Sequence, residues 1–222
     1  MLDRTTVSTK GAEGKVLVVR LVFERRAGKA VSGEWLYLLF GNQFLIGREE
    51  GCEIRITNDR ISRKHCLIRL LEDQAKLTDL GSTNGTARNG ELIEDEIILE
   101  NRDKIDVGQG VVFLVRLCSR AGRLSSVRLH GGNEVYLLAS NEVLIGKFQE
   151  EGGDVDLMIY DASLGSRHCR IEHFYNDNFI VALSPEAPVL VNGKPVKELG
   201  LKDGDLIELA DSAFRWKVVS LT

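Results

Sequence analysis

The chain has 222 residues, of which 43% are hydrophobic, enough for one large or two small packed domains without help from metals or disulfides. Its 29 basic and 33 acidic residues give a formal net charge of −4 and are interleaved along the sequence. This balance excludes the broad basic surface that non-specific nucleic-acid binding requires, so we expect any anion to bind at a local site.

The four cysteines, Cys52, Cys66, Cys118 and Cys169, lack the short spacings of a metal site, and we expect free thiols in a reducing compartment. No stretch reaches the roughly 18 consecutive apolar residues of a membrane-spanning helix, and the N-terminus has no apolar run. We therefore expect a cytoplasmic protein that does not insert into membranes, binds no nucleic acid and needs no metal or cofactor.

Short segments with alternating apolar residues follow one another along the chain. They are residues 16–23, 34–40, 65–71 and 111–117, then SVRLH, EVYLLA, CRIEH, NFIVAL and FRWKVV. Gly, Asn and Asp separate them about every 8–12 residues, and no segment carries a helical apolar stripe over three turns. This pattern predicts an all-β protein built as a sandwich or a barrel.

The two halves of the chain resemble each other. EWLYLLFGNQFLIGR (34–48) aligns without gaps with NEVYLLASNEVLIGK (133–147), and RISRKHC (60–66) aligns with SLGSRHC (163–169). We infer a tandem duplication of a unit of about 100 residues, the size of a small sandwich domain. The expected division is a flexible tail at 1–14, a first domain at 15–118, a short polar linker at 119–123 and a second domain at 124–222.

Small polar and basic residues concentrate in the first domain. Their order is Gly47-Arg48, Ser62-Arg63-Lys64-His65, Ser82-Thr83-Asn84-Gly85-Thr86 and Asn89-Gly90. After a glycine, the Arg48 guanidinium can project from a strand end, and its planar fork suits a phosphate. Ser62 offers a hydroxyl and Arg63 a second cation, while Thr83 and Asn84 lie on another loop. Loops at one end of a sandwich cluster in space, so these residues can converge on one anion.

This order and spacing resembles the forkhead-associated (FHA) domain, a β-sandwich that binds phosphothreonine in partner proteins. The resemblance covers about residues 34–115 and implies two FHA-type β-sandwich domains in tandem. It assigns the phosphate to Arg48 and Ser62, with Arg63 and Thr83 assisting, and it assigns to Asn84 the peptide backbone beside the phosphothreonine.

The resemblance also assigns supporting roles. Arg60 stands where loops of this family often read the side chain three positions after the phosphothreonine, which suggests an acidic preference there. Four residues would support the loops, namely Gly47, His65, Gly85 and Asn89. Asn84-Gly85 and Asn89-Gly90 also fit plain hairpin turns, and for Asn89 we prefer that interpretation.

The tail contains the adjacent threonines Thr5 and Thr6. Some bacterial members of the family carry a kinase-targeted threonine pair in such a tail, and the phosphorylated tail occupies their own pocket. Thr5 and Thr6 are therefore candidate phosphorylation sites, and a plain flexible terminus is the alternative.

Ser62, His65 and Asp79 also invite comparison with a hydrolase triad. On an extended segment, residues three apart would lie about 10 Å apart on opposite faces, and the sequence has no nucleophile elbow. We therefore expect no enzymatic activity.

The second domain keeps the strands and the histidine but not the polar set. Its counterparts of the arginine, serine and asparagine are Lys147, Gly165 and Ala187. Either this domain is a scaffold or dimerisation surface without a ligand site, or Lys147, Ser166 and Arg167 form a looser anion site. A retained fold with a lost site favours the scaffold.

Together these features predict an adaptor in serine/threonine kinase signalling whose first domain binds phosphothreonine. Its partners would be a phosphothreonine-containing protein or peptide and a serine/threonine kinase. The alternative is a phospho-independent assembly or dimerisation protein that uses both sandwiches as protein-protein surfaces. The complete polar set of the first domain favours the adaptor.

Overall fold

The computed structural model describes residues 17–26, 28–30, 33–132, 134–149, 154–175 and 177–219. Within these ranges the chain forms strands and no helix, so the all-β prediction is confirmed. It follows that no described helix is long and apolar enough to cross a membrane. The expected tail at 1–14, with Thr5 and Thr6, lies outside the described residues.

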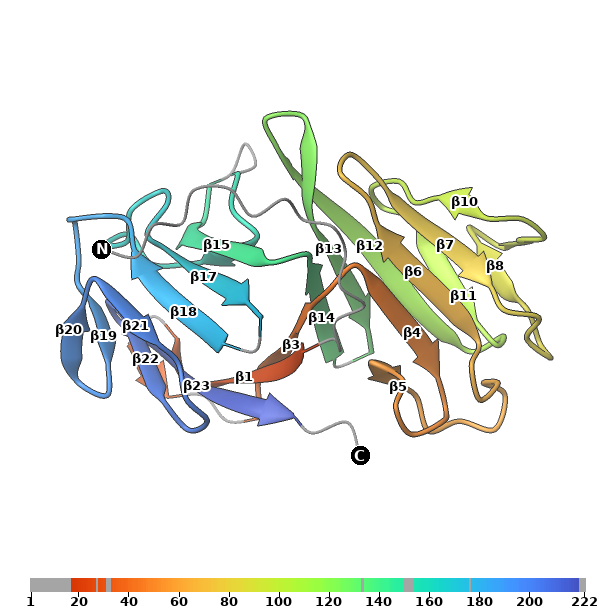
Figure 1. The fold of residues 1–222 in the computed structure, drawn as a ribbon, viewed down its shortest axis with the longest axis horizontal. Helices are drawn as coiled ribbons and strands as arrows, with labels where there is room; N and C mark the ends of the chain where they lie inside the picture. Colours follow the sequence, from red (N-terminus) through yellow and green to blue (C-terminus); the bar gives the residue numbers. More distant parts are fainter. Residues whose placement is uncertain are drawn as a thin grey trace.

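Two small sheets each form one layer of a sandwich (Figure 1). The first has the order β10-β7-β6-β4-β5, with β4 (Gln43–Gly47), β5 (Ile54–Arg55), β6 (Cys66–Leu70), β7 (Ala75–Asp79) and β10 (Ile97–Ile98). The second has the order β16-β15-β17-β18-β21, with β15 (Glu142–Lys147), β16 (Leu157–Ile159), β17 (Cys169–Phe174), β18 (Asp177–Ala182) and β21 (Glu198–Gly200). One small sheet thus comes from each repeat.

One 13-stranded sheet supplies the other layer of both sandwiches, in the order β20-β19-β22-β23-β1-β3-β14-β13-β12-β11-β8-β9, with β2 paired to β1. The first repeat contributes β1 (Leu17–Arg26), β2 (Lys29–Ala30), β3 (Trp35–Phe40), β8 (Thr86–Arg88), β9 (Glu91–Leu92), β11 (Lys104–Val107) and β12 (Val111–Arg120). The second contributes β13 (Arg123–Gly131), β14 (Glu134–Ala139), β19 (Val189–Val191), β20 (Lys194–Val196), β22 (Leu206–Leu209) and β23 (Ser212–Val219).

The two repeats exchange their first hairpins. The last strand of the first repeat, β12, pairs with β13, and β13 pairs in turn with β14 of the same hairpin. The last strand of the second repeat, β23, pairs with β1, and β1 pairs in turn with β3. The core of the first sandwich accordingly contains Val127, Leu129 and Leu138 from the second repeat. The core of the second contains Leu21 and Leu38 from the first repeat. Each sandwich is therefore completed by a hairpin of the other repeat.

Strands β3 and β14 lie side by side in the middle of the large sheet. They pair in parallel with Tyr37 opposite Tyr136, and the two rings stack with centroids 5.1 Å apart. Leu38 packs into the core of the second sandwich and its neighbour Leu39 into the core of the first. A strand that is covered on both faces needs a continuous apolar run, which explains why WLYLLF does not alternate strictly with polar residues.

The expected linker at 119–123 is the tip of a β-hairpin. β12 ends at Arg120 and β13 begins at Arg123, and the two residues face each other in the ladder. Ala121 and Gly122 both have positive φ, 50° and 77°, which is the geometry of a tight two-residue turn. Because β12 continues directly into β13, the units of packing differ from the units of the sequence repeat.

A buried carboxylate holds this hairpin against the second sandwich. Asp156 accepts hydrogen bonds from Arg120 Nη1 at 2.6 Å, Ser125 Oγ at 2.8 Å, Ser126 Oγ at 2.6 Å and the Leu144 N–H at 2.8 Å. A buried carboxylate is costly unless it is paired and fully hydrogen-bonded. These four donors therefore fix the hairpin relative to the second small sheet.

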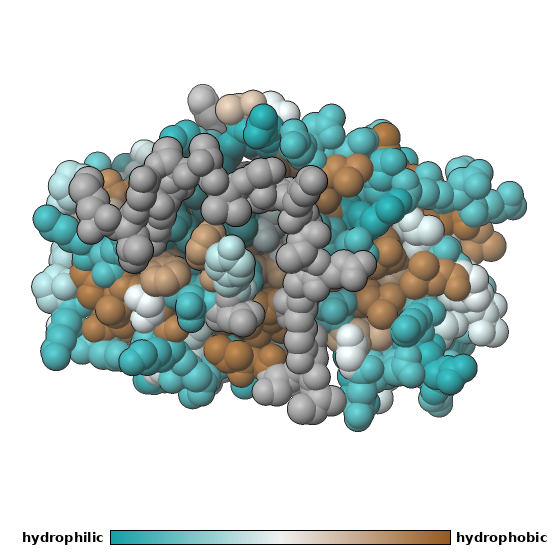
Figure 2. All heavy atoms as spheres, viewed as in Figure 1, coloured by the Kyte–Doolittle hydropathy of each residue, from teal (hydrophilic) through white to brown (hydrophobic). Residues whose placement is uncertain are grey.

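The largest of the fully buried side chains lie inside the two sandwiches. Trp216, Phe214 and Phe40 belong to the core of the second sandwich and Phe44 to that of the first. On the face shown in Figure 2, the remaining hydrophobic residues form separate patches between hydrophilic ones. Trp216 is therefore a core residue and not a platform for a ligand.

Candidate binding site

The loops at one end of the first sandwich surround a hollow of about 600 Å³. It is lined by Arg48, Glu49, Ser62, Arg63, Lys64 and Thr83. Four of the six predicted binding residues thus converge, although they come from loops up to 35 positions apart in the sequence, the separation of Arg48 and Thr83. The other two, Arg60 and Asn84, are not part of this lining.

Gly47 allows two of these loops to approach closely. The Arg48 N–H donates to the Ser62 carbonyl at 3.1 Å, and the Glu49 N–H donates to the Arg63 carbonyl at 3.1 Å. A Cβ on Gly47 would lie 2.1 Å from the Arg63 carbonyl oxygen, far inside van der Waals contact. The missing side chain therefore sets the position of the exposed Arg48 beside Ser62.

We expect Gly47→Ala to weaken binding at this hollow at least tenfold, about 1.4 kcal/mol, and to lower the melting temperature. The added methyl group would push the Ser62 loop away from Arg48. Phosphopeptide titration calorimetry and thermal unfolding would measure both effects. The matched control is Gly110→Ala, where a Cβ meets nothing within 4 Å. Wild-type affinity and melting temperature in Gly47→Ala would contradict this reading.

The hollow carries more positive than negative charge. The side chains of Arg48, Arg63 and Lys64 are exposed, and none of them pairs with a carboxylate of the described residues. Glu49 is the single carboxylate in the lining. Three cations that have no carboxylate partner among the described residues favour an external anion that can accept several charge-assisted hydrogen bonds.

Two hydroxyl groups, those of Ser62 and Thr83, line the same hollow as these cations. The Thr83 N–H donates to Ser62 Oγ at 3.0 Å, and Ser62 Oγ lies 3.4 Å from Thr83 Oγ1. The bond joins the loop before β6 to the loop after β7. Both hydroxyls are thereby held at the hollow, where each can donate to an anion.

His65 connects two of the loops through hydrogen bonds at both of its ring nitrogens. Its side chain is fully buried, its Nδ1 accepts the Ser62 N–H at 3.0 Å, and its Nε2 lies 3.1 Å from the Gly85 carbonyl oxygen. Because Nδ1 acts as an acceptor, the ring proton is on Nε2 and is donated to Gly85. This arrangement suits the architectural role predicted for His65 and Gly85.

The expected separation of Ser62 and His65 is wrong. Residues 62–65 form a turn instead of an extended segment, and the Ser62 amide contacts the imidazole. The Ser62 hydroxyl nevertheless faces Thr83. Asp79 Oδ2 lies 4.0 Å from His65 Nε2, whose proton goes to Gly85. The nitrogen that would have to activate the serine hydroxyl is occupied by a backbone N–H, so the geometry is not that of a triad.

Asp79 organises the loop that carries Thr83, a role that the sequence reading missed. Its carboxylate accepts hydrogen bonds from the Ser82 N–H at 2.8 Å, from Ser82 Oγ at 2.7 Å and from Thr86 Oγ1 at 2.6 Å. Burial alone would raise the pKa of this carboxyl, but the bonds from Thr86 and Ser82 outweigh it and hold the pKa below its ordinary value. The spacing of Asp, Ser and Thr in DLGSTNGT is the signal for this loop anchor.

Arg60 and Asn84 are held beside the hollow by a third loop. Asn84 Nδ2 donates to the Arg60 carbonyl at 2.7 Å, Arg60 Nη1 donates to the Gln109 carbonyl at 2.8 Å, and Gln109 Nε2 donates to the Asn84 carbonyl at 3.2 Å. A Cβ on Gly108 would lie 2.7 Å from the Arg60 carbonyl oxygen. The sequence reading also missed Gln109, and the GQG at 108–110 is the local signal for it.

Asn89 lies outside this cluster. It occupies the turn between β8 and β9 with φ of 54°, its Nδ2 donates to Asp103 Oδ1 at 2.8 Å, and its Oδ1 accepts the Lys104 N–H at 2.9 Å. Asn192, its counterpart in the second repeat, makes the same pair of bonds to Asp205 and Leu206. Asn89 is thus a turn residue that shapes the hairpin.

The second sandwich repeats the backbone hydrogen bonds of this site, but side chains of its own occupy the space at Gly165. The Lys147 N–H donates to the Gly165 carbonyl at 3.1 Å, and the Gly165 N–H donates to His168 Nδ1 at 3.3 Å. A Cβ on Gly165 would lie 2.5 Å from Ser184 Oγ and 3.4 Å from Glu186 Oε2. The serine hydroxyl therefore comes from the opposite loop, and a carboxylate lies beside it.

The looser anion site considered for this sandwich, Lys147, Ser166 and Arg167, has negatively charged neighbours. Arg167 forms an ion pair with Asp154, and the Glu186 carboxylate stands next to Gly165. An incoming phosphate would meet both carboxylates. The expectation that this domain lacks the phosphothreonine pocket stays a prediction, and this geometry supports it.

Comparison with known proteins supplies the family. A sequence model of the FHA domain matches residues 44–108 and again residues 143–210, together more than half of the chain. The chain belongs to the FHA-domain family. This confirms the resemblance seen in the motifs, and the two matched regions begin within β4 and β15, just after the exchanged hairpins.

Individual relatives match parts of the chain. Human proliferation marker protein Ki-67 is 36% identical over 88 residues, 40% of this chain and 3% of that protein. The oxoglutarate dehydrogenase inhibitor of Corynebacterium jeikeium is 32% identical over 108 residues, 48% of this chain and 72% of that protein. An FHA-domain structure from work on "phosphothreonine-dependent FHA domain interactions" is 31% identical and covers 46% of this chain and 99% of its own, with a TM-score of 0.35.

FHA domains are phosphopeptide-binding modules and not enzymes, so this chain belongs among protein-interaction modules. The described residues contain no group of three or more His, Cys, Asp or Glu side chains that could hold a metal ion.

Proposed function

We propose that the chain is an adaptor whose first FHA domain binds phosphothreonine segments of partner proteins. The observation that carries the proposal is the hollow itself, where three cations without a described carboxylate partner surround two hydroxyl groups. A phosphate group presents three acceptor oxygens and nearly two negative charges, which match this arrangement.

Arg48 would bind two phosphate oxygens through its planar guanidinium, and Ser62 and Thr83 would donate their hydroxyl protons to the others. Arg63 would add charge at the rim. Asn84 would hold the peptide backbone next to the phosphothreonine, since its side-chain oxygen is not used in the bond to the neighbouring loop.

Arg60 would contact an acidic side chain three positions further along the peptide. Its guanidinium donates to one carbonyl of the third loop and is otherwise exposed. A carboxylate of the peptide would therefore find an available cation at this side of the hollow.

The magnitudes fit a reversible signalling contact. Hydrogen bonds to a charged group contribute about 1.5–3 kcal/mol each. Three or four of them, less the free energy of ordering the peptide, correspond to a micromolar dissociation constant, about −8 kcal/mol. Such a contact would follow the action of a serine/threonine kinase on the partner. A tail phosphorylated at Thr5 or Thr6 would compete for the same hollow at high effective concentration.

The second FHA domain would serve as the structural partner of the first. In this domain Asp154 pairs with Arg167, and the Glu186 carboxylate lies beside Gly165. The three cations of the first hollow have no carboxylate partner among the described residues. In the alternative function, neither domain would bind phosphate and both would act as protein-protein surfaces. The unpaired cations of the first domain favour the phosphothreonine adaptor.

The test is an oriented phosphothreonine peptide library offered to the full chain, with matched phosphoserine and unphosphorylated libraries. We expect micromolar binding that depends on the phosphate, weaker binding of phosphoserine and an acidic preference three positions after the phosphothreonine. Equal retention of the phosphorylated and unphosphorylated libraries by the folded protein would support the assembly function instead.

A further inference from the structure

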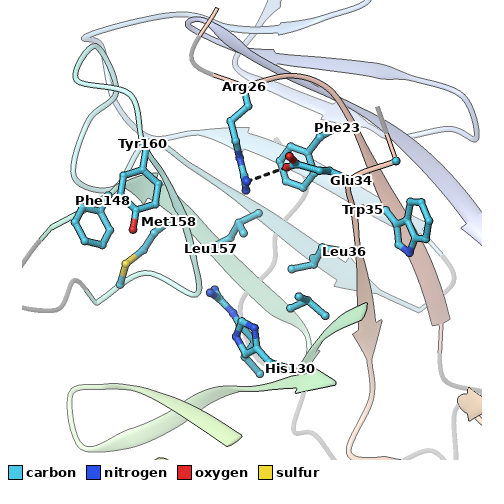
Figure 3. Close-up of a pocket in the computed structure, with 13 residues that line it drawn as sticks. Phe23, Arg26, Glu34, Trp35, Leu36, His130, Phe148, Leu157, Met158 and Tyr160 are labelled. Atoms are coloured by element: carbon cyan, nitrogen blue, oxygen red, sulfur yellow. Dashed lines mark hydrogen bonds and ion pairs between the residues drawn. The ribbon is translucent and has the colours of Figure 1, made fainter. Parts of the chain in front are cut away.

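A second pocket lies where the exchanged hairpins meet the second sandwich (Figure 3). Its volume is about 550 Å³, within the range of ligand-binding sites, and it shares no lining residue with the phosphopeptide hollow. Trp35 and Leu36 come from the first repeat, whereas His130, Leu157 and Tyr160 come from the second. Neither repeat could form this pocket alone.

The pocket has an apolar base and an aromatic rim. Leu36 and Leu157 are only 5% and 4% exposed, whereas Phe148 and Tyr160 are 37% and 61% exposed. The rings of Phe148 and Tyr160 stack with centroids 4.2 Å apart, and Figure 3 shows them on the opposite side of the pocket from Trp35. Exposed aromatic rings around an apolar base are typical of the anchoring points of protein interfaces.

The unused polar groups of the pocket are hydrogen-bond donors. The half-buried Arg128 donates to the backbone carbonyl of Asp156 and pairs with no carboxylate of the described residues. Trp35 Nε1 is buried without a hydrogen-bond partner in the described part of the chain. The carboxylate of the lining, Glu34, is already paired with Arg26 at 2.9 Å.

The histidine of the lining, His130, does not change this balance. Burial, followed by the charges of Arg128 and Arg116, lowers the pKa of His130 and so favours its neutral imidazole. Arg26 also lies over the Phe23 ring, 4.9 Å from its centroid. Arg128 interacts electrostatically with the Asp156 carboxylate but has no carboxylate within ion-pairing distance among the described residues. A carboxylate in the pocket is therefore the group that would complement it.

We propose that this pocket docks an unphosphorylated segment of a partner protein in which a large apolar side chain stands next to a carboxylate. The apolar side chain would rest on Leu36 and Leu157 between Tyr160 and Trp35, and the carboxylate would meet Arg128. A protein segment fits better than a small molecule because the exposed aromatic rim extends the apolar surface beyond the pocket itself. This docking is independent of the phosphothreonine site.

The test uses the full chain and two peptides, acetyl-Gly-Phe-Asp-Gly-amide and its Phe-Asn counterpart. The protein has two tryptophans, and the indole N–H resonance of Trp35 reports on the pocket while that of the fully buried Trp216 serves as the internal reference. We expect a saturable shift of the Trp35 signal, with millimolar affinity for so short a ligand and about fivefold tighter binding of Phe-Asp than of Phe-Asn. Absence of saturation up to about 10 mM, or equal affinity for both peptides, would overturn the proposal.

Two variants show whether the named side chains are responsible. Tyr160→Ala removes an exposed ring of the rim and should weaken the Phe-Asp peptide severalfold, whereas Tyr175→Ala removes a tyrosine that is 73% exposed outside the pocket and should have no effect. Arg128→Gln should abolish the preference for Asp over Asn, with the Trp216 signal reporting that the variant is folded. Equal effects of the two tyrosine variants, or a retained preference in folded Arg128→Gln, would overturn the proposal.

Discussion

Replacement of Arg48 by alanine is expected to weaken phosphothreonine binding about a hundredfold, since two charge-assisted hydrogen bonds and their charge pairing are lost together. The side chain is exposed and makes no described ion pair, so the free energy of unfolding should change by no more than about 0.5 kcal/mol. Titration calorimetry with a phosphothreonine peptide from the library, together with chemical unfolding, measures both quantities.

Three controls separate charge from geometry. Arg48→Lys keeps a point charge without the planar fork and should recover only part of the affinity. Arg55→Ala removes a neighbouring exposed arginine that pairs with Glu50 at 3.5 Å and donates to the Arg48 carbonyl at 3.3 Å, and it should lower the affinity far less than Arg48→Ala does. Lys147→Ala alters the matching position of the second domain and should leave the affinity unchanged. If Lys147→Ala lowered the affinity as much as Arg48→Ala does, the assignment of the binding site to the first domain would be wrong.

Leu129→Ala is expected to destabilise the first sandwich by about 2–5 kcal/mol, the usual range for a buried leucine, although Leu129 belongs to the second repeat. Its side chain is 1% exposed and packs in the core that also contains Ile68 and Leu77. Hydrogen exchange should therefore accelerate in β6 and β7, and phosphopeptide affinity should fall as the loops at the end of these strands lose their support.

The matched control is Leu21→Ala, which removes the same side chain from the first repeat. Leu21 is fully buried in the core of the second sandwich with Ile171 and Ile180. Exchange should then accelerate mainly in β17 and β18, with a smaller effect on phosphopeptide binding. If Leu21→Ala loosened β6 and β7 and Leu129→Ala loosened β17 and β18, each repeat would use its own hairpin and the exchange would be refuted.

The family and the strands could be predicted from the sequence, but the hairpin exchange could not. WLYLLF and EVYLLA carry the same apolar pattern, so either hairpin can complete either sandwich. The choice depends on contacts between residues about 100 positions apart, such as Tyr37 against Tyr136. One local signal existed, since Ala121-Gly122 fits a tight hairpin turn, but within SRAGR it also fits a polar linker.

The convergence of Arg48, Ser62 and Thr83 could be predicted because the spacing of their motifs is characteristic of the family. Asp79 was missed although its hydrogen bonds to Ser82 and Thr86 are local, because the sequence invites comparison of this residue with a hydrolase triad. Gln109 was missed because its hydrogen bond reaches Asn84, which lies on another loop 25 positions away. Glu186 was missed because the alignment compares one position at a time. It shows that Gly165 replaces Ser62, but it does not show that Glu186 lies beside Gly165.

The 13-stranded sheet shared by the two sandwiches also determines which of its strand edges are exposed to other chains. Had each sandwich kept its own hairpin, the six-residue apolar strands β3 and β14 would each have ended a sheet, and such edges are templates for strand-by-strand aggregation. Pairing β3 with β14 removes both. The sheet now ends in β9, only two residues long, and in β20, where Pro195 has no N–H to donate. The large sheet, which contains the longest apolar strands, is thereby protected from association through its own backbone.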